Sequence, residues 1–168
     1  MKKILLLSDT HSFIDDFILK HVKLADEVWH AGDIGAIHVA DQIQKLKPFK
    51  AVYGNIDDAQ VRLAFPEHLS FICEGLRVLI LHIAGKPGRY TPQAKSLIRI
   101  HQPDLFICGH SHILNVSRNT SPKHLHMNPG AAGTHGFHTS RTMIRLEVHQ
   151  GKIGNVEVIE ISRKLVST

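Results

Sequence analysis

The first half of the sequence alternates short apolar runs with stretches of helical periodicity. The runs KILLLSD, DEVWHAGD, FKAVYGN and RVLILH have the composition of strands, and the stretches between the first three predict helices over residues 15–24 and 36–47. A further helix is predicted over residues 92–101, because Pro92 suits a first helical turn, and it leads into the strand DLFICG. This alternation is typical of βαβ units and a mostly parallel sheet.

The sequence after His112 consists of strand-like segments separated by turns. These are ILNVSRN, KHLHMN, TMIRLEVH and KIGNVEVIEIS, and the last two meet around Gln150 and Gly151 in a predicted hairpin. This half is expected to be largely antiparallel, with residues 152–164 as an edge strand and tail; such an edge would suit a homo-oligomer. No linker or repeat divides the sequence, so we expect a single domain over residues 1–168, of the α/β or α+β class with two packed sheets.

The cysteines and the length of the apolar runs indicate a cytoplasmic protein. Cys73 and Cys108 lie in apolar runs, where small buried strand residues are more expected than a disulfide framework or a zinc knuckle. The run Ile4–Leu7 is too short for a signal peptide, and no stretch approaches the roughly 18 apolar residues of a membrane span. We therefore expect no membrane partner.

The charge distribution argues against a nucleic-acid partner. The formal net charge is +5, but lysine and arginine are scattered, and only 6% of the residues are aromatic, too few for a base-stacking surface. The residue type that stands out is histidine, of which there are 14.

Polar residues repeatedly follow the end of an apolar strand. In an open α/β sheet the carboxyl ends of parallel strands meet along one edge, where ligands bind. Loops after the predicted strands would thus bring seven side chains to one crevice. These residues are Asp9, His11, Asp33, Asn55, His82, His110 and His112.

These seven residues have the chemistry of a catalytic metal site. Carboxylates, imidazoles and an amide oxygen without thiolate fit a catalytic site better than a closed structural zinc site. Seven ligands are too many for one ion, whereas two ions bridged by one carboxylate would each have about four. The glycines before Asp33, Asn55 and His110 allow close backbone approach to a ligand. His110 and His112 are predicted to face the crevice together, because alternate residues of an extended segment point the same way, while Ser111 points elsewhere.

The motifs that contain these residues are DTH (residues 9–11), GD (32–33), GN (54–55), His82 and GHSH (109–112). The order of these motifs resembles the calcineurin-like metallophosphoesterase superfamily, in particular its small bacterial and archaeal phosphodiesterases. The NPG at residues 128–130 is similar to a loop of that branch, so the resemblance spans about residues 1–130. It implies a sandwich of two mixed β-sheets flanked by helices, in αββα order.

The resemblance also implies the ligand assignment. Asp9, His11 and His112 would hold one metal ion, Asn55, His82 and His110 the other, and Asp33 would bridge them. The catalytic residues carried over are Asp33, Asn55 and His110. The implied reaction is hydrolysis of a phosphodiester by a hydroxide bridging two divalent metals, with Mn²⁺ as the expected ion, although Ni²⁺, Fe²⁺ and Zn²⁺ suit the same ligands.

The sequence departs from the family pattern at two places. Many members read GNHE, where the histidine is thought to protonate the leaving group, but here Ile56 occupies that position and leaves the general acid unassigned. His135 and His138, in the glycine-flanked GTHGFH loop, are candidates for this role. For Asp57, a general-acid role and a supporting role behind the site are equally consistent with the sequence. The glycine that often follows the strand-terminal histidine is delayed here to Gly85, which alters the rim.

Most other histidines have simpler explanations. His30 is expected to support the site rather than bind metal, and His124 and His126 alternate on a strand, which predicts a shared solvated face. Trp29 and Phe106 are expected in the core. The remaining histidines are expected to be surface residues or hydrogen-bonded core residues, namely His21, His38, His68, His101 and His149.

The sequence thus predicts a metal-dependent phosphodiesterase acting on a small phosphoester. The alternative is a binding scaffold of the same fold with little or no catalysis, as in the retromer subunit. Because all seven ligand positions are present, the enzyme is favoured. The physiological substrate and the native metal are left open, since rim loops set specificity and several ions accept these ligands.

Overall fold

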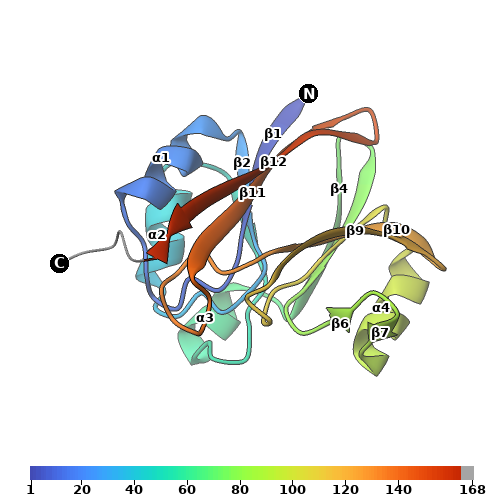
Figure 1. The fold of residues 1–168 in the computed structure, drawn as a ribbon, viewed down its shortest axis with the longest axis horizontal. Coiled ribbons are helices and arrows are strands. Elements are labelled where there is room, and N and C mark those ends of the chain that lie inside the picture. The colour runs from blue at the N-terminus through green and yellow to red at the C-terminus, as the bar shows by residue number, and fades with distance from the viewer. Residues whose placement is uncertain (164–168) are drawn as a thin grey trace.

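The computed structural model describes residues 1–163 and contains two five-stranded mixed β-sheets, with helices on both outer sides (Figure 1). The fold is the αββα sandwich expected from the sequence. Helices α1 (Asp16–Leu24) and α2 (His38–Gln44) lie on one side, and α4 (Pro92–His101) lies on the other (Figure 1). No helix within these residues is long and apolar enough to cross a membrane.

The first sheet combines the two ends of the chain. Its strands, in spatial order, are β12 (Lys152–Ser162), β11 (Ser140–His149), β1 (Lys2–Leu7), β2 (Glu27–His30) and β3 (Phe49–Ala51). Strands β1, β2 and β3 are parallel, whereas β11 is antiparallel to β1 and to β12. The hairpin predicted at Gln150 and Gly151 is confirmed and makes β12 an edge strand; residue 164 lies outside the described residues.

The second sheet is formed by the middle of the chain. Its strands, in spatial order, are β4 (His68–Cys73), β5 (Leu76–Leu81), β8 (Leu105–Ile107), β10 (Lys123–Pro129) and β9 (Leu114–Thr120). Strands β5, β8 and β10 are parallel, and the outer strands β4 and β9 are antiparallel to their neighbours. A two-stranded ribbon of β6 (Gly85–Lys86) and β7 (Arg89–Tyr90) connects β5 to α4.

Apolar side chains pack in three layers that hold the sheets and helices together. Between the sheets, side chains of the first sheet such as Ile4 and Trp29 pack with Ile80 and Ile107 of the second. Trp29 also meets Phe71 of β4 edge to face, with ring centroids 5.1 Å apart. One outer layer packs α1 and α2 on the first sheet, and the other packs α4 on the second. The core positions expected for Trp29 and Phe106 are confirmed, as is the burial of both cysteines.

The helix predictions succeed where capping signals are present. Pro92–His101 is helical as predicted, with Thr91 as N-cap, and Asp15 caps the helix that begins one residue later. The helix predicted over residues 36–47 is shorter, at His38–Gln44, and has no side-chain cap. The sequence patterns do not indicate β4 or the six-residue helix α3 (Ala59–Ala64), which Asp58 caps.

Two expectations about the second half need correction. The antiparallel pairs β9–β10 and β11–β12 lie in different sheets, and β10 is parallel to β8. The solvated face predicted for His124 and His126 is also wrong, because both are buried against Tyr90 of β7. The Tyr90 hydroxyl lies 2.9 Å from His124 Nε2 and 2.8 Å from His126 Nδ1. Burial lowers the pKa of His126 to about 4.

A partly buried ion pair joins β11 to the start of α1, close to the loop after β1. Arg141 is 2% exposed, and its guanidinium donates to both carboxylate oxygens of Asp15 at 2.9 and 3.1 Å. Its Nε also donates to the Ala132 carbonyl at 2.7 Å. The Asp15 carboxylate in turn accepts from the Ile18 amide at the first turn of α1. This pair therefore fixes two segments that border the loop carrying Asp9 and His11.

Replacing Asp15 with alanine is expected to lower the free energy of unfolding by about 3 kcal/mol, because it leaves a buried guanidinium unpaired and removes an N-cap. Urea unfolding followed by circular dichroism measures the change. Asp16→Ala, at the neighbouring exposed carboxylate, is the matched control. A loss no larger than the control's would contradict this role for the pair.

Candidate metal centre

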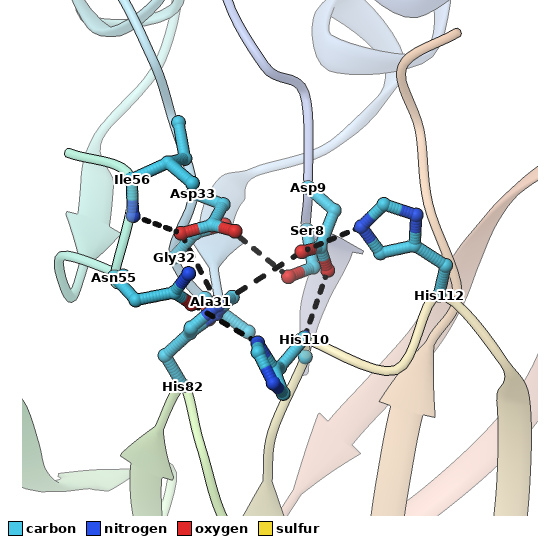
Figure 2. A network of polar contacts seen from close by, with 12 residues as sticks. Ser8, Asp9, Ala31, Gly32, Asp33, Asn55, Ile56, His82, His110 and His112 are labelled. Atoms are coloured by element: carbon cyan, nitrogen blue, oxygen red, sulfur yellow. Dashed lines mark hydrogen bonds and ion pairs between the residues drawn. The ribbon is translucent and has the colours of Figure 1, made fainter. Parts of the chain in front are cut away.

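The loops after five strands meet at one end of the molecule and bring together the seven side chains singled out in the sequence. Asp9 and His11 follow β1, Asp33 follows β2 and Asn55 follows β3, all in the first sheet; His82 follows β5, and His110 and His112 follow β8, in the second. Six of them surround one space in Figure 2, where the carboxylates of Asp9 and Asp33 face the imidazoles. The site is therefore built from both sheets.

The first group of donor atoms consists of Asp9, His11 and His112. Asp9 is fully buried, and its Oδ1 lies 3.2 Å from His112 Nε2 and 3.9 Å from His11 Nε2. The rings of His11 and His112 stand edge to face. One donor atom from each residue lies within 4.8 Å of the other two, which is the spacing of ligands around a single ion.

The second group consists of Asp33, His82 and His110, with Asn55 between the two rings. Asp33 Oδ1 lies 3.2 Å from His82 Nε2, and the donor atoms of these three residues also lie within 4.8 Å of one another. Asn55 Oδ1 lies 3.1 Å from His82 Nε2 and 3.0 Å from His110 Nδ1. The other oxygen of Asp33 lies 3.4 Å from His11 Nε2 of the first group. Asp33 thus stands between the two groups.

The donor set fits metal ions, because buried acceptor atoms in it lack partners. Asp9 Oδ1 and His11 Nε2 are inaccessible to solvent and have no hydrogen-bond partner among the described residues. Unpaired buried polar atoms lower the stability of the folded protein. Asp9 Oδ1 and His11 Nε2 lie 3.9 Å apart, so one cation could bind both. On the other side, Asp33 Oδ1 and Asn55 Oδ1 converge on one nitrogen of His82.

The electrostatics of the cluster also favour a cation. Burial would raise the pKa of Asp33, but the nearby imidazoles of His11 and His82 outweigh it and hold that pKa far below its usual value. The Asp9 carboxylate, 3.2 Å from His112 Nε2, raises the pKa of His112. For His82, burial acts to lower the pKa, but the bond to Asp33 and the charge of Asp9 together raise it. The Asp33 carboxylate is thus ionised and attracts positive charge.

The orientation of His82 is fixed by the backbone of a neighbouring strand. Its Nδ1 donates to the Ala31 carbonyl at 2.7 Å, which leaves Nε2 facing Asp33 and Asn55 (Figure 2). Proteins usually aim a metal-binding histidine in this way: one ring nitrogen donates to a carbonyl, and the other faces the metal.

His30 supports the site from behind, as expected. It is fully buried, and its Nδ1 accepts from the Gly32 amide at 3.1 Å. Its Nε2 then donates to the Thr10 hydroxyl, 2.9 Å away, which donates to the Ile34 carbonyl at 3.0 Å. This chain of hydrogen bonds ties the loop after β1 to the loop after β2.

Asp57 ties the loop after β2 to the loop after β3. Its buried carboxylate accepts from the amides of Ile34 at 3.2 Å, Gly35 at 2.7 Å and Gly54 at 2.7 Å. Of the two roles left open for Asp57, these contacts support the one behind the site.

The backbone at the site requires conformations that sequence patterns do not reveal. Asp9, His11, Asp33, His110 and His112 all have positive φ, between 46° and 69°. His110 and His112 both line the cleft over the donor atoms, as predicted, but not because the segment is extended: the GHSH loop is tightly turned and delivers one imidazole to each group of donors. Non-glycine residues in this region carry strain, which is concentrated at functional sites.

The glycines of the motifs are required because the carboxylates of the site lie too close to their backbone for a Cβ atom. A Cβ at Gly54 would lie 2.1 Å from Asp33 Oδ1, and a Cβ at Gly109 would lie 2.8 Å from Asp9 Oδ2. Asn128, from the NPG segment, holds the loop after β8 from the other side. Its Nδ2 donates to the Gly109 carbonyl at 2.9 Å and lies 3.0 Å from Ser111 Oγ. The Ser111 hydroxyl is thus bonded to Asn128 and to the Ile113 amide rather than to the donor atoms.

A cleft of about 610 Å³ opens over the donor atoms. The two histidines of the GTHGFH loop line it: His135 stacks on His11 with centroids 4.6 Å apart, and His138 lies against His112 at 5.3 Å. His138 is also bonded to the Gly133 carbonyl at 2.9 Å. A general-acid role for either residue remains a prediction. Three exposed apolar side chains complete the rim, namely Ile56, Ile113 and Phe137.

Sequence comparisons place these features in a known family. Residues 1–151 match the model described as the calcineurin-like phosphoesterase superfamily domain. A probable metallophosphoesterase from Methanothermobacter thermautotrophicus is 28% identical over 111 residues, covering 63% of this chain and 64% of that protein. The match thus spans less than two thirds of the relative's length.

Solved structures have the same fold at low sequence identity. Wild-type Vps29 from Entamoeba histolytica, complexed with Zn²⁺, aligns with a TM-score of 0.72 and 17% identity over 96% of this chain and 99% of its own. A novel archaeal phosphodiesterase aligns with a TM-score of 0.69 and 21% identity over 94% and 99%. At these identities the likeness concerns the fold alone.

Proposed function

This chain belongs to the calcineurin-like phosphoesterase superfamily, and from that premise we propose that it hydrolyses phosphodiesters with two divalent metal ions. The observation that carries the proposal is the pair of donor groups with Asp33 between them, each spaced for one ion. When bound, two such ions supply an activated water and stabilise charge on the attacking and leaving oxygens.

The residues divide between the two ions as the donor groups suggest. Asp9, His11 and His112 would hold one ion, and His82, His110 and Asn55 the other, with Asp33 reaching both. The ion-binding face of His82 is aimed by the Ala31 carbonyl. Asn55 and His110 line the cleft, so they also stand where a phosphoryl oxygen would bind.

The charge of the site favours a diester over a monoester. The seven side chains include two carboxylates, Asp9 and Asp33, so two divalent ions leave the centre positively charged. A singly charged phosphodiester balances such a centre closely once water is activated there. The ligands are imidazole, carboxylate and amide without thiolate, and we propose Mn²⁺ as the working ion, with Fe²⁺, Ni²⁺ and Zn²⁺ as alternatives.

The rival function is a binding scaffold with little catalysis. The likeness to Vps29 structures is consistent with that possibility at the level of the fold. Retention of the complete donor set, with Asp9 Oδ1 and His11 Nε2 buried and unpaired within the described residues, favours the enzyme. A scaffold would have no need to maintain these unpaired atoms.

The test is hydrolysis of bis(p-nitrophenyl) phosphate and of p-nitrophenyl phosphate by protein stripped of metal and reloaded with Mn²⁺. The diester is expected to be the better substrate, and chelation by EDTA is expected to abolish hydrolysis reversibly. Asn55→Ala and His110→Ala are expected to lower kcat by about a hundredfold or more, because each removes a group at the second ion.

The control variant is Asn119→Ala, an amide on β9 away from the donor groups. Absence of hydrolysis of both compounds, with metal bound at two equivalents, would favour the scaffold. Equal activity of the wild type and the two site variants would show that the site assignment is wrong.

A further inference from the structure

A second cleft of about 400 Å³ begins at His110 and extends away from the donor groups, beneath the β6–β7 ribbon. His110 and Ser111 line both this cleft and the one over the donor atoms, so the two meet at the GHSH loop. A substrate bound at the metal centre therefore has a path for one arm toward the ribbon.

The far wall of this cleft carries two like charges at close quarters. Lys86 and Arg89 lie directly opposite each other in the ribbon, where like charges repel. Neither forms an ion pair within residues 1–163, and no acidic side chain is among the described residues that line the cleft. An anion between the two side chains would relieve this repulsion.

The ribbon is anchored, so these charges are held beside the cleft. Tyr90, next to Arg89, is 8% exposed, and its hydroxyl is hydrogen-bonded to both His124 and His126 beneath it. The base of the ribbon is closed by the Thr91 amide, which donates to the Ala84 carbonyl at 3.0 Å. A Cβ on Gly85 would lie 2.5 Å from the Arg89 carbonyl oxygen, so the two strands approach as closely as glycine allows.

The opposite wall offers a neutral polar group. Asn115 of β9 is half-buried and lines the cleft, and its side chain makes no hydrogen bond within residues 1–163. Asn128, its partner across the β9–β10 pair, is already bonded to Gly109 and Ser111. The Asn115 side chain is thus available to bond a ligand, whereas Asn128 lines the cleft with its amide already bonded.

We propose that this cleft binds a second phosphate on one arm of the substrate, so that the preferred substrates are phosphodiesters with an additional phosphate on the arm that is retained after hydrolysis. The inference rests on the proposed function, because the scissile phosphate must lie at the metal centre for its arm to reach the ribbon. Lys86 and Arg89 bind the second phosphate, and Asn115 bonds the arm between the two phosphates.

The test compares two substrates with the same leaving group. One is the p-nitrophenyl ester of thymidine 5′-phosphate, and the other is the same compound with a phosphate on the 3′ oxygen. The ratio of their kcat/KM values is expected to favour the second by about tenfold at low salt, and to fall as ionic strength rises, because the contacts are partly exposed.

The double variant Lys86→Gln/Arg89→Gln is expected to bring this ratio close to one. Its matched control, Lys45→Gln/Arg118→Gln, removes the same charge from exposed positions outside the cleft and is expected to keep the wild-type ratio. Calorimetry supplies a second readout that does not require turnover. Thymidine 3′,5′-bisphosphate is expected to bind the Mn²⁺-loaded protein about tenfold more tightly than thymidine 5′-phosphate, and the double variant to lose the difference.

The outcomes separate this inference from the proposed function. If neither ester is hydrolysed but the bisphosphate retains its Lys86- and Arg89-dependent advantage in binding, the second phosphate site stands and the catalytic proposal is wrong. If both esters are hydrolysed with a ratio that the double variant does not change, the phosphodiesterase stands and the second site is wrong. Equal binding of the two nucleotides to the wild type would also overturn the site.

Discussion

Replacing Asp33 with asparagine is expected to lower kcat/KM for bis(p-nitrophenyl) phosphate by about a thousandfold, which corresponds to about 4 kcal/mol in the activation free energy. Asp33 is the carboxylate between the two donor groups, with one oxygen near His82 and the other near His11. The amide has nearly the same shape but one charge less and only one acceptor oxygen, so it cannot serve both ions.

The measurement combines steady-state kinetics with metal analysis of the same samples by plasma mass spectrometry. Bound metal is expected to fall from about two equivalents toward one or none. Asp41→Asn, at an exposed carboxylate of α2, is the control and is expected to retain both activity and metal. An Asp33→Asn protein with wild-type kinetics and full metal content would rule out a bridging role for this residue.

Replacing Asp57 with alanine is expected to lower the free energy of unfolding by about 4 kcal/mol, because two buried amides and one half-buried amide lose their acceptor at once. These amides belong to Ile34 and Gly35, which follow Asp33, and to Gly54, which precedes Asn55. The same change is expected to weaken metal binding, because the two loops are no longer tied together. The Asp57 carboxylate forms no hydrogen bond or ion pair with the donor atoms of the described residues, so its effect is on their position.

Two readouts distinguish positioning from a merely structural role. Urea unfolding of the metal-free protein gives the loss of stability, and titration with Mn²⁺ under native conditions gives the loss of affinity. Asp57→Asn is expected to restore part of both, because its amide oxygen still accepts hydrogen bonds. Asp41→Ala is the control for the loss of a carboxylate at the surface. Metal affinity unchanged in folded Asp57→Ala would contradict the positioning role.

The ends of the strands were predictable from sequence because the residues in the strands are apolar and those that follow are polar. A buried apolar run followed by Asp9 or His82 marks both a strand and the point where it leaves the sheet. Capped helices were predictable for a similar local reason, since Asp15 and Thr91 bond the first turns that follow them. The family pattern then placed these strands in two sheets.

Features that depend on distant contacts were not predictable in the same way. The alternation of His124 and His126 correctly gives one shared face, but the sequence does not reveal that Tyr90, more than 30 residues earlier, covers it. The turn that carries His110 and His112 likewise depends on Asp9, whose Oδ2 accepts from the His110 amide at 3.1 Å. In both cases a non-local hydrogen bond overrides the local pattern.

The middle layer of the fold has a consequence for how activity can be lost. Asp33 comes from one sheet and His82 from the other, and the contact of Trp29 with Phe71 is among those that set how the sheets lie on each other. A small slip of one sheet over the other would separate these donors while leaving every strand and hydrogen-bonded ladder intact. Hydrolysis would then report the alignment of the two halves of the molecule, and a variant could be fully folded by circular dichroism yet inactive through a change far from the cleft.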